Sequence, residues 1–239
     1  MTLEVCAQSI QSCLTAQKAG AWRVELCQAL ELGGLTPSSG VIQMATNYLT
    51  IPIHVLIRPR SGHFTYSRVE QECIISEIDN VKAMGASGVV VGALDEDGDV
   101  DVDLLERMIR RADPLEVTFH RAIDVSRDYQ EAMKVLIDSG CTRVLTSGRV
   151  KRAIDGIDLL KQTVDSFGDQ IEIMAGSGVS ATNIADFASI GIEHFHLSGS
   201  QRVSGQNSEV MDMGYSETSL QSIKEARDII KQLRKKDKD

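Results

Sequence analysis

The sequence predicts a single (β/α)₈ barrel of the TIM type, an α/β fold in which eight parallel strands alternate with eight helices. Short apolar segments alternate with amphipathic segments along the whole chain, and eight such pairs recur at roughly 25 to 35 residues. The length of 239 residues suits one barrel domain, which we place at residues 1–239 because no linker divides the chain. An open, doubly wound sheet is the alternative, but it usually has fewer repeats at this length.

The first half of the chain supplies four strand–helix pairs. The first strand, at 3–8, precedes a helix at 9–20 that has Ser9 as a candidate N-cap and Gly20 as its stop. A glycine-rich loop separates the second strand from its helix. The next three pairs are expected at 23–28 and 36–49, at 51–59 and 67–85, and at 88–94 and 101–112.

The second half of the chain repeats the alternation. Ser180 is a candidate N-cap for the seventh helix, and a polar loop that contains Met211 and Met213 joins the last strand to the last helix. The four pairs are expected at 115–124 and 128–140, at 143–148 and 153–168, at 171–178 and 180–191, and at 192–200 and 216–236.

Composition excludes several classes of protein. The formal net charge of −9 argues against a nucleic-acid partner, which normally meets a basic patch. No apolar run reaches about 18 residues, so we expect no membrane span, and Met1 leads directly into a strand rather than a signal peptide. The five cysteines are odd in number and scattered, which predicts free thiols and a cytoplasmic location.

The first two strands both place a carboxylate and a thiol on one face. Residues two apart on a strand point to the same side, so Glu4 lies beside Cys6 and Glu25 beside Cys27. The apolar residue between them suits the helix-facing layer, which leaves both pairs inside the barrel. Buried carboxylates are costly unless they are paired, and Arg58 and Arg60 are the expected partners. A buried structural Glu–Arg network and a functional polar pocket both remain open.

Several ordered motifs resemble the CutC family, which is named for copper homeostasis. The segments that carry the resemblance, between Leu3 and about Ser200, are EVC, RVELC…GGLTPS, IPIHVLIRPRSGHFTYS, VVVGALDEDGDVD, VTFHRAID, RVLTSG and IMAGSGV. The resemblance implies a (β/α)₈ barrel and copper handling. The family usually has RPRGGDF where this chain has RPRSGHF, with Ser61 and His63, so we carry over no acidic side chain from that loop.

A copper hypothesis rests on the paired cysteines. Cu(I) prefers thiolates, and Cys6 and Cys27 occupy equivalent motif positions on adjacent strands, so we expect their thiols to lie together. His54 and His120 are candidate nitrogen ligands. His196 shares a strand face with His194, but a zinc hydrolase needs further ligands from other strands. A buried thiol pair without a metal is the alternative.

An anion-binding hypothesis rests on the loops after strands seven and eight, where barrels commonly bind phosphate. Glycines allow backbone N–H groups to approach a ligand, although glycines that only form tight turns are the alternative. The candidate residues are Arg60, Ser147, Gly148, Gly176, Ser177, Gly178, Ser198 and Gly199.

The strand ends also supply an acid–base set. Glu4, Glu25 and His120 are candidates for proton transfer, because burial and proximity can separate two carboxyl pKa values. Arg58 and Arg121 are candidates for stabilising negative charge, with Asp124 orienting His120 or Arg121. The sequence therefore predicts a copper-binding protein, or alternatively a lyase- or isomerase-like enzyme that acts on a small phosphorylated or carboxylated metabolite. Assembly into a homo-oligomer is compatible with either function.

Overall fold

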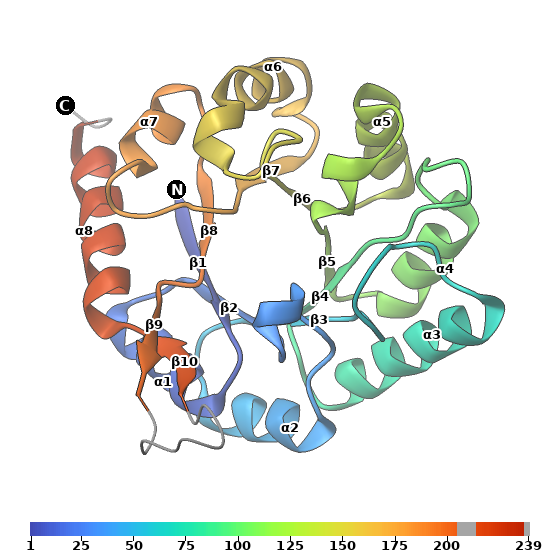
Figure 1. Cartoon of the computed structure of the whole chain (residues 1–239), viewed down its shortest axis with the longest axis horizontal. Coiled ribbons are helices and arrows are strands. Elements are labelled where there is room, and N and C mark those ends of the chain that lie inside the picture. The colour runs from blue at the N-terminus through green and yellow to red at the C-terminus, as the bar shows by residue number, and fades with distance from the viewer. Residues whose placement is uncertain (205–213, 237–239) are drawn as a thin grey trace.

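The computed structural model describes residues 1–204 and 214–236, and within this part of the chain eight parallel strands close into a barrel. The strands pair in chain order, and β1 pairs with both β2 and β8, which closes the ring (Figure 1). They are β1 (Thr2–Ala7), β2 (Arg23–Leu26), β3 (Ile53–Leu56), β4 (Gly88–Val91), β5 (Glu116–Phe119), β6 (Arg143–Thr146), β7 (Glu172–Ala175) and β8 (His194–Leu197). The predicted fold class is confirmed.

Helices surround the barrel on the outside, as Figure 1 shows. Ser9 caps the first of them by accepting a hydrogen bond from the N–H of Ser12, and Gly20 ends it in the left-handed conformation, as the sequence predicted. The helices are α1 (Ile10–Ala19), α2 (Ser39–Tyr48), α3 (Arg68–Ala83), α4 (Val102–Ala112), α5 (Tyr129–Ser139), α6 (Ile157–Phe167), α7 (Ile184–Ser189) and α8 (Leu220–Lys236). Short 3₁₀ helices follow three strands: η1 (Leu30–Leu32), η2 (Arg121–Val125) and η3 (Ala153–Gly156).

The hydrophobic core lies between the barrel and the helices. Val5, Val24 and Val55 on adjacent strands are fully buried there. The barrel interior holds a separate, small apolar cluster of Cys6, Cys27, Leu56 and Val90. Most other inward positions are polar, which is unusual because barrel interiors are normally filled with branched aliphatic residues.

Most elements are shorter than predicted, and the fifth strand and the seventh helix differ for identifiable reasons. The fifth strand ends at Phe119 and η2 follows it, so the predicted strand at 115–124 is too long. The seventh helix begins at Ile184 rather than at 180, because Asn183 Oδ1 accepts a hydrogen bond from the N–H of Ser180 and holds a turn there. Ser180 is therefore not its N-cap.

The segment after β8 forms a second, two-stranded sheet. Strands β9 (Ser200–Val203) and β10 (Tyr215–Thr218) pair antiparallel, where the sequence predicted a polar loop followed by a helix from 216. The Ser12 hydroxyl accepts a hydrogen bond from the N–H of Thr218, which anchors the pair to α1. Met211 and Met213 lie outside the described residues.

No helix among residues 1–204 and 214–236 is both long and apolar enough to cross a membrane.

Candidate functional site

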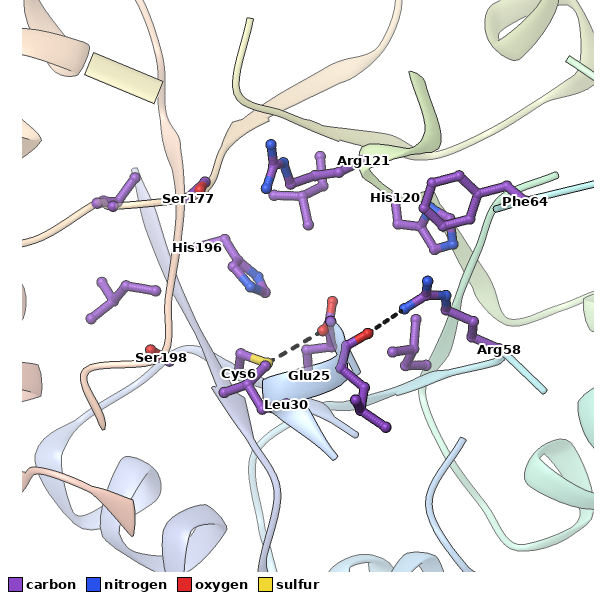
Figure 2. Close-up of a pocket in the computed structure, with 17 residues that line it drawn as sticks. Cys6, Glu25, Leu30, Arg58, Phe64, His120, Arg121, Ser177, His196 and Ser198 are labelled. Carbon is purple, nitrogen blue, oxygen red and sulfur yellow. Dashed lines mark hydrogen bonds between the residues drawn. The ribbon is translucent and has the colours of Figure 1, made fainter. Parts of the chain in front are cut away.

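A cavity of about 500 Å³ opens at the end of the barrel where the strands terminate. Figure 2 shows its lining, which comes from strand ends and from the loops that follow them. Nine residues predicted from the sequence line this cavity: Cys6, Glu25, Arg58, His120, Arg121, Ser177, Gly178, His196 and Ser198. The strand-end prediction therefore located the cavity.

The thiols of Cys6 and Cys27 lie beside this cavity, with their Sγ atoms 3.6 Å apart. Both residues are buried, and Cys6 lines the cavity. The predicted equivalence of their positions is wrong, because Cys6 pairs in register with Glu25 rather than with Cys27. Adjacent strands of a closed barrel are staggered, and here the stagger is two residues. The two sulfurs meet diagonally across β1 and β2.

Cys6, Glu25 and His196 form a cluster in which one ligand atom from each lies within 4.8 Å of the others. Cys6 Sγ is 3.5 Å from Glu25 Oε1. His196 Nδ1 lies 2.7 Å from Glu4 Oε1, so a proton on Nδ1 leaves Nε2 available to a ligand. The hydrogen bond with Cys27, burial and the nearby Glu25 raise the pKa of Cys6 well above its usual value. Without a bound cation, the Cys6 thiol therefore stays protonated.

The two strand carboxylates have opposite electrostatic environments. Burial raises the pKa of Glu25, and the nearby Glu4 adds to this effect. Burial also opposes ionisation of Glu4, but the Arg23 guanidinium and a hydrogen bond from His196 hold its pKa well below the usual range. Oε2 of Glu25 is buried without a hydrogen-bond partner among the described residues. Glu4 is thus held as an anion, whereas the carboxyl group of Glu25 keeps its proton to a higher pH than usual.

Arg23, rather than Arg58 or Arg60, neutralises Glu4. Its Nε donates to Glu4 Oε2 at 2.5 Å, and its side chain is only 4% exposed. The predicted pairing of the carboxylates with Arg58 and Arg60 is therefore wrong. Register explains the difference, because Glu4 and Arg23 are direct neighbours across β1 and β2.

Below Glu4, a polar network that the sequence did not predict continues toward the opposite end of the barrel. Arg23 and Arg143 both lie within 4 Å of Glu116, at 3.9 and 3.2 Å. Arg143 also pairs with Glu172. Each of these residues stands two positions before an inward-facing residue on its own strand. Because residues two apart on a strand share a face, the alternation along each strand could have predicted that they also point inward.

His54 belongs to this lower network and not to the cavity. Its Nε2 lies 3.4 Å from Glu116 Oε2, and burial lowers its pKa. His194 is also in this layer, where its Nδ1 is 2.8 Å from the Thr2 hydroxyl oxygen. Neither imidazole is among the residues that line the cavity. Of the three histidines on β3 and β8, only His196 lies in the cluster with Cys6.

Arg58 and Arg60 hold loops in place. Arg58 is buried, donates to the carbonyls of Leu32, Gly34 and Gly62, and lies over the Phe64 ring at 5.0 Å. Arg60 pairs instead with Glu70 at 2.5 Å and is not among the cavity-lining residues. Its Nη1 also donates to the main-chain carbonyls of Ser61 and His63.

His120 is a neutral imidazole at the cavity wall. Its Nδ1 accepts a hydrogen bond from the N–H of Ala122, which places the ring proton on Nε2. Burial and the nearby Arg58 lower its pKa to about 3. Gly92 makes room for the ring, because a Cβ there would lie 2.3 Å from His120 Cε1. The ring of Phe64 packs beside it with centroids 4.9 Å apart.

Asp124 lies behind the cavity and contacts Arg121. The Nε of Arg121 donates to Asp124 Oδ2 at 2.8 Å. Asp124 also accepts hydrogen bonds from Ser147 and from the hydroxyl of Thr146. It therefore orients Arg121 and not His120.

The predicted anion-binding residues divide into two groups. The N–H groups of Ser147, Gly148 and Gly176 already donate within the protein, to Asp124 and Thr146. Ser177 and Gly178, in contrast, line the cavity, and their N–H groups donate to no described residue. Ser198 lines the cavity as well, whereas the adjacent Gly199 is not part of the lining.

Comparison with known proteins identifies one family and close relatives in it. The model of the CutC family matches residues 1–201. The family protein CutC of Photobacterium profundum is 43% identical over 198 residues and covers 82% of this chain and 81% of its own. The family protein CutC of Bacteroides fragilis strain YCH46 is 42% identical over 241 residues and covers 96% of each chain.

A solved structure supports the same relationship. The crystal structure of a provisionally named copper homeostasis protein CutC from Streptococcus agalactiae superimposes with a TM-score of 0.79 at 32% identity. The match covers 83% of this chain and 99% of that one.

Proposed function

The chain belongs to the CutC family, and we propose that it acts in copper homeostasis by binding Cu(I) between the thiols of Cys6 and Cys27. The name of the Streptococcus agalactiae relative directs attention to copper. The observation that carries the proposal is the 3.6 Å separation of two thiols, of which that of Cys6 lines an open cavity. Soft thiolates are the ligands that Cu(I) prefers.

The separation of the sulfurs favours a bent site with a third ligand. With metal–sulfur bonds of roughly 2.3 Å, two sulfurs at this separation subtend an angle of about 100° at the ion. A linear two-coordinate ion needs a larger separation. His196 is the third ligand, because it lies in the same cluster as Cys6 and Glu4 holds its other nitrogen.

Metal binding displaces protons at this site. The raised pKa of Cys6 keeps the thiol protonated before copper arrives, so its proton leaves as the ion binds. Free thiols and Cu(I) both persist in a reducing compartment, and all five cysteines are free. We therefore place the protein in the cytoplasm, with Cu(I) as its cargo.

An anaerobic titration with Cu(I) against a competing chromogenic chelator tests this proposal. We expect one high-affinity Cu(I) per chain in the wild type and its loss in the Cys6→Ser/Cys27→Ser variant. Cys73→Ser is the matched control, because Cys73 is an exposed thiol on α3 outside this cavity. Equal affinity in the double variant and the wild type refutes the site.

A second candidate function, acid–base catalysis on a small phosphorylated or carboxylated metabolite, is favoured by one observation. Two carboxyl groups at the same end of the barrel have pKa values shifted in opposite directions. Deuterium exchange from solvent into C–H bonds of pooled metabolites, followed by mass spectrometry, tests it. Exchange that disappears in Glu25→Gln supports the enzyme, and no exchange with any metabolite in the pool counts against it.

A further inference from the structure

The cavity is much larger than a copper site requires. Cys6, Glu25 and His196 occupy one side of it, whereas its volume of about 500 Å³ lies within the range of pockets that hold small organic molecules. Figure 2 shows Arg58 and Arg121 on other sides, flanking His120. The remaining space in the cavity is therefore lined by two arginine side chains rather than by the thiols.

Arg58 is a buried cation that pairs with no carboxylate among residues 1–204 and 214–236. Its terminal nitrogens donate to three carbonyl oxygens, of Leu32, Gly34 and Gly62, and its Nε has no hydrogen-bond partner among the described residues. Carbonyl groups solvate a guanidinium but do not cancel its charge, and buried charges are normally paired. An anion in the adjoining cavity would supply the missing negative charge.

Arg121 adds a second positive charge at the cavity rim. Asp124 holds its Nε, and Ser147 and the Val150 carbonyl hold its Nη2, so the guanidinium is fixed in position. The Nη1 atom of Arg121 makes no hydrogen bond to any residue in the described ranges. The Arg121 side chain is 39% exposed, so Nη1 is accessible to a ligand. A guanidinium held on one edge and free on the other is suited to binding an oxyanion.

The opposite wall offers further donors and an apolar surface. Ser177 and Gly178 line the cavity, and their N–H groups donate to no described residue. Leu56, Leu145 and Val179 line it as well, and they provide contact for a hydrocarbon portion. Inorganic phosphate alone would leave most of this volume and apolar surface uncovered.

From these contacts we infer that the cavity binds a small organic oxyanion, a carboxylate or a phosphate ester, with its charged group between Arg58 and Arg121. The body of the ligand lies over the leucines, and its other end reaches the Cys6, Glu25 and His196 side. The charged group lies away from the thiol pair, so binding of the anion does not require copper.

Isothermal titration with phenyl phosphate, benzoate and inorganic phosphate tests the inference. We expect phenyl phosphate or benzoate to bind at millimolar concentration or below and more tightly than inorganic phosphate. The tighter of the two organic probes identifies the oxyanion class. Arg121→Gln should weaken binding about tenfold, because one charge-assisted contact is lost. Arg58→Gln should do the same, provided that its circular dichroism and melting temperature show a folded protein.

Two control variants distinguish loss of the anion site from a general loss of positive charge and from loss of the copper site. Arg110→Gln removes an equally charged side chain from the exposed face of α4 and should leave binding unchanged. Cys6→Ser/Cys27→Ser should lose Cu(I) but keep the organic anion, whereas Arg121→Gln should keep Cu(I). Failure of all three probes to bind overturns the inference, as does unchanged affinity in Arg121→Gln.

Discussion

Replacing Glu25 by Gln should strengthen Cu(I) binding, although it removes a carboxylate from the site. Glu25 Oε1 lies 3.5 Å from Cys6 Sγ, and its negative charge disfavours the thiolate that copper needs. At that separation two like charges repel by about 5 kcal/mol at an effective dielectric constant of about 20. The realised effect is smaller, because burial raises the pKa of Glu25 and so favours its uncharged form. We expect about a tenfold to hundredfold gain in affinity at pH 7.5, or about 1.4 to 2.7 kcal/mol.

Competition with a Cu(I) chelator, under argon and across pH 5 to 9, measures this effect. The gain should grow with pH as Glu25 ionises in the wild type, and it should vanish at acidic pH, where the wild-type carboxyl is already neutral. Gln is nearly isosteric with Glu, so the cavity keeps its shape. Glu96→Gln, in the loop before α4, is the matched control that removes one acidic charge outside the cavity.

The opposite result would refute this reasoning. A weaker affinity in Glu25→Gln would mean that the carboxylate is a copper ligand rather than a repulsive neighbour of the thiolate. An affinity that does not change at any pH would mean that copper binds elsewhere.

Three further predictions follow from the same geometry. Arg23→Met should lower the free energy of unfolding by about 3 to 5 kcal/mol at pH 7, because it leaves Glu4 buried without its main partner; urea denaturation measures it. The pKa of Glu4 is lowered in the folded protein, so the Arg23–Glu4 pair stabilises the fold above the usual carboxyl pKa and loses this effect as the pH falls. The difference in free energy of unfolding between Arg23→Met and the wild type should therefore narrow in acid. Gly92→Ala should displace the His120 ring, shift its imidazole NMR signals and cost about 1 to 3 kcal/mol, whereas unchanged signals would contradict the close packing. Cu(I) affinity should rise with pH from 6 to 8, because the Cys6 thiol, whose pKa is raised, gives up its proton as copper binds; a flat profile would exclude Cys6 as a thiolate ligand.

The alternation of residues along each strand was enough to predict the fold and the inward residues of the cavity. In EVC and in ELC, the apolar middle residue faces the helices, and both Glu4 and Cys6 point inward as expected. The helix caps Ser9 and Gly20 could be predicted because both depend on short-range interactions. Ser9 accepts a hydrogen bond from the N–H three residues later, and Gly20 adopts a left-handed conformation that favours glycine.

The pairing between strands was not predictable, because register is a property of two segments rather than one. The stagger of two residues places Arg23 beside Glu4 and Glu25 beside Cys6, and a single sequence carries no signal for it. The predicted pairing of the buried carboxylates with Arg58 and Arg60 was wrong for this reason. Similarly, nothing local in residues 200–203 indicated pairing with β10, because the partner strand is remote in sequence.

X-ray absorption at the copper edge of the stoichiometric Cu(I) complex tests the central claim most directly. The account predicts two sulfur neighbours at roughly 2.3 Å and one nitrogen neighbour. The nitrogen signal should disappear in His196→Ala while both sulfurs remain. A first shell without sulfur, or one that is identical in Cys6→Ser/Cys27→Ser, would contradict a copper site between β1 and β2.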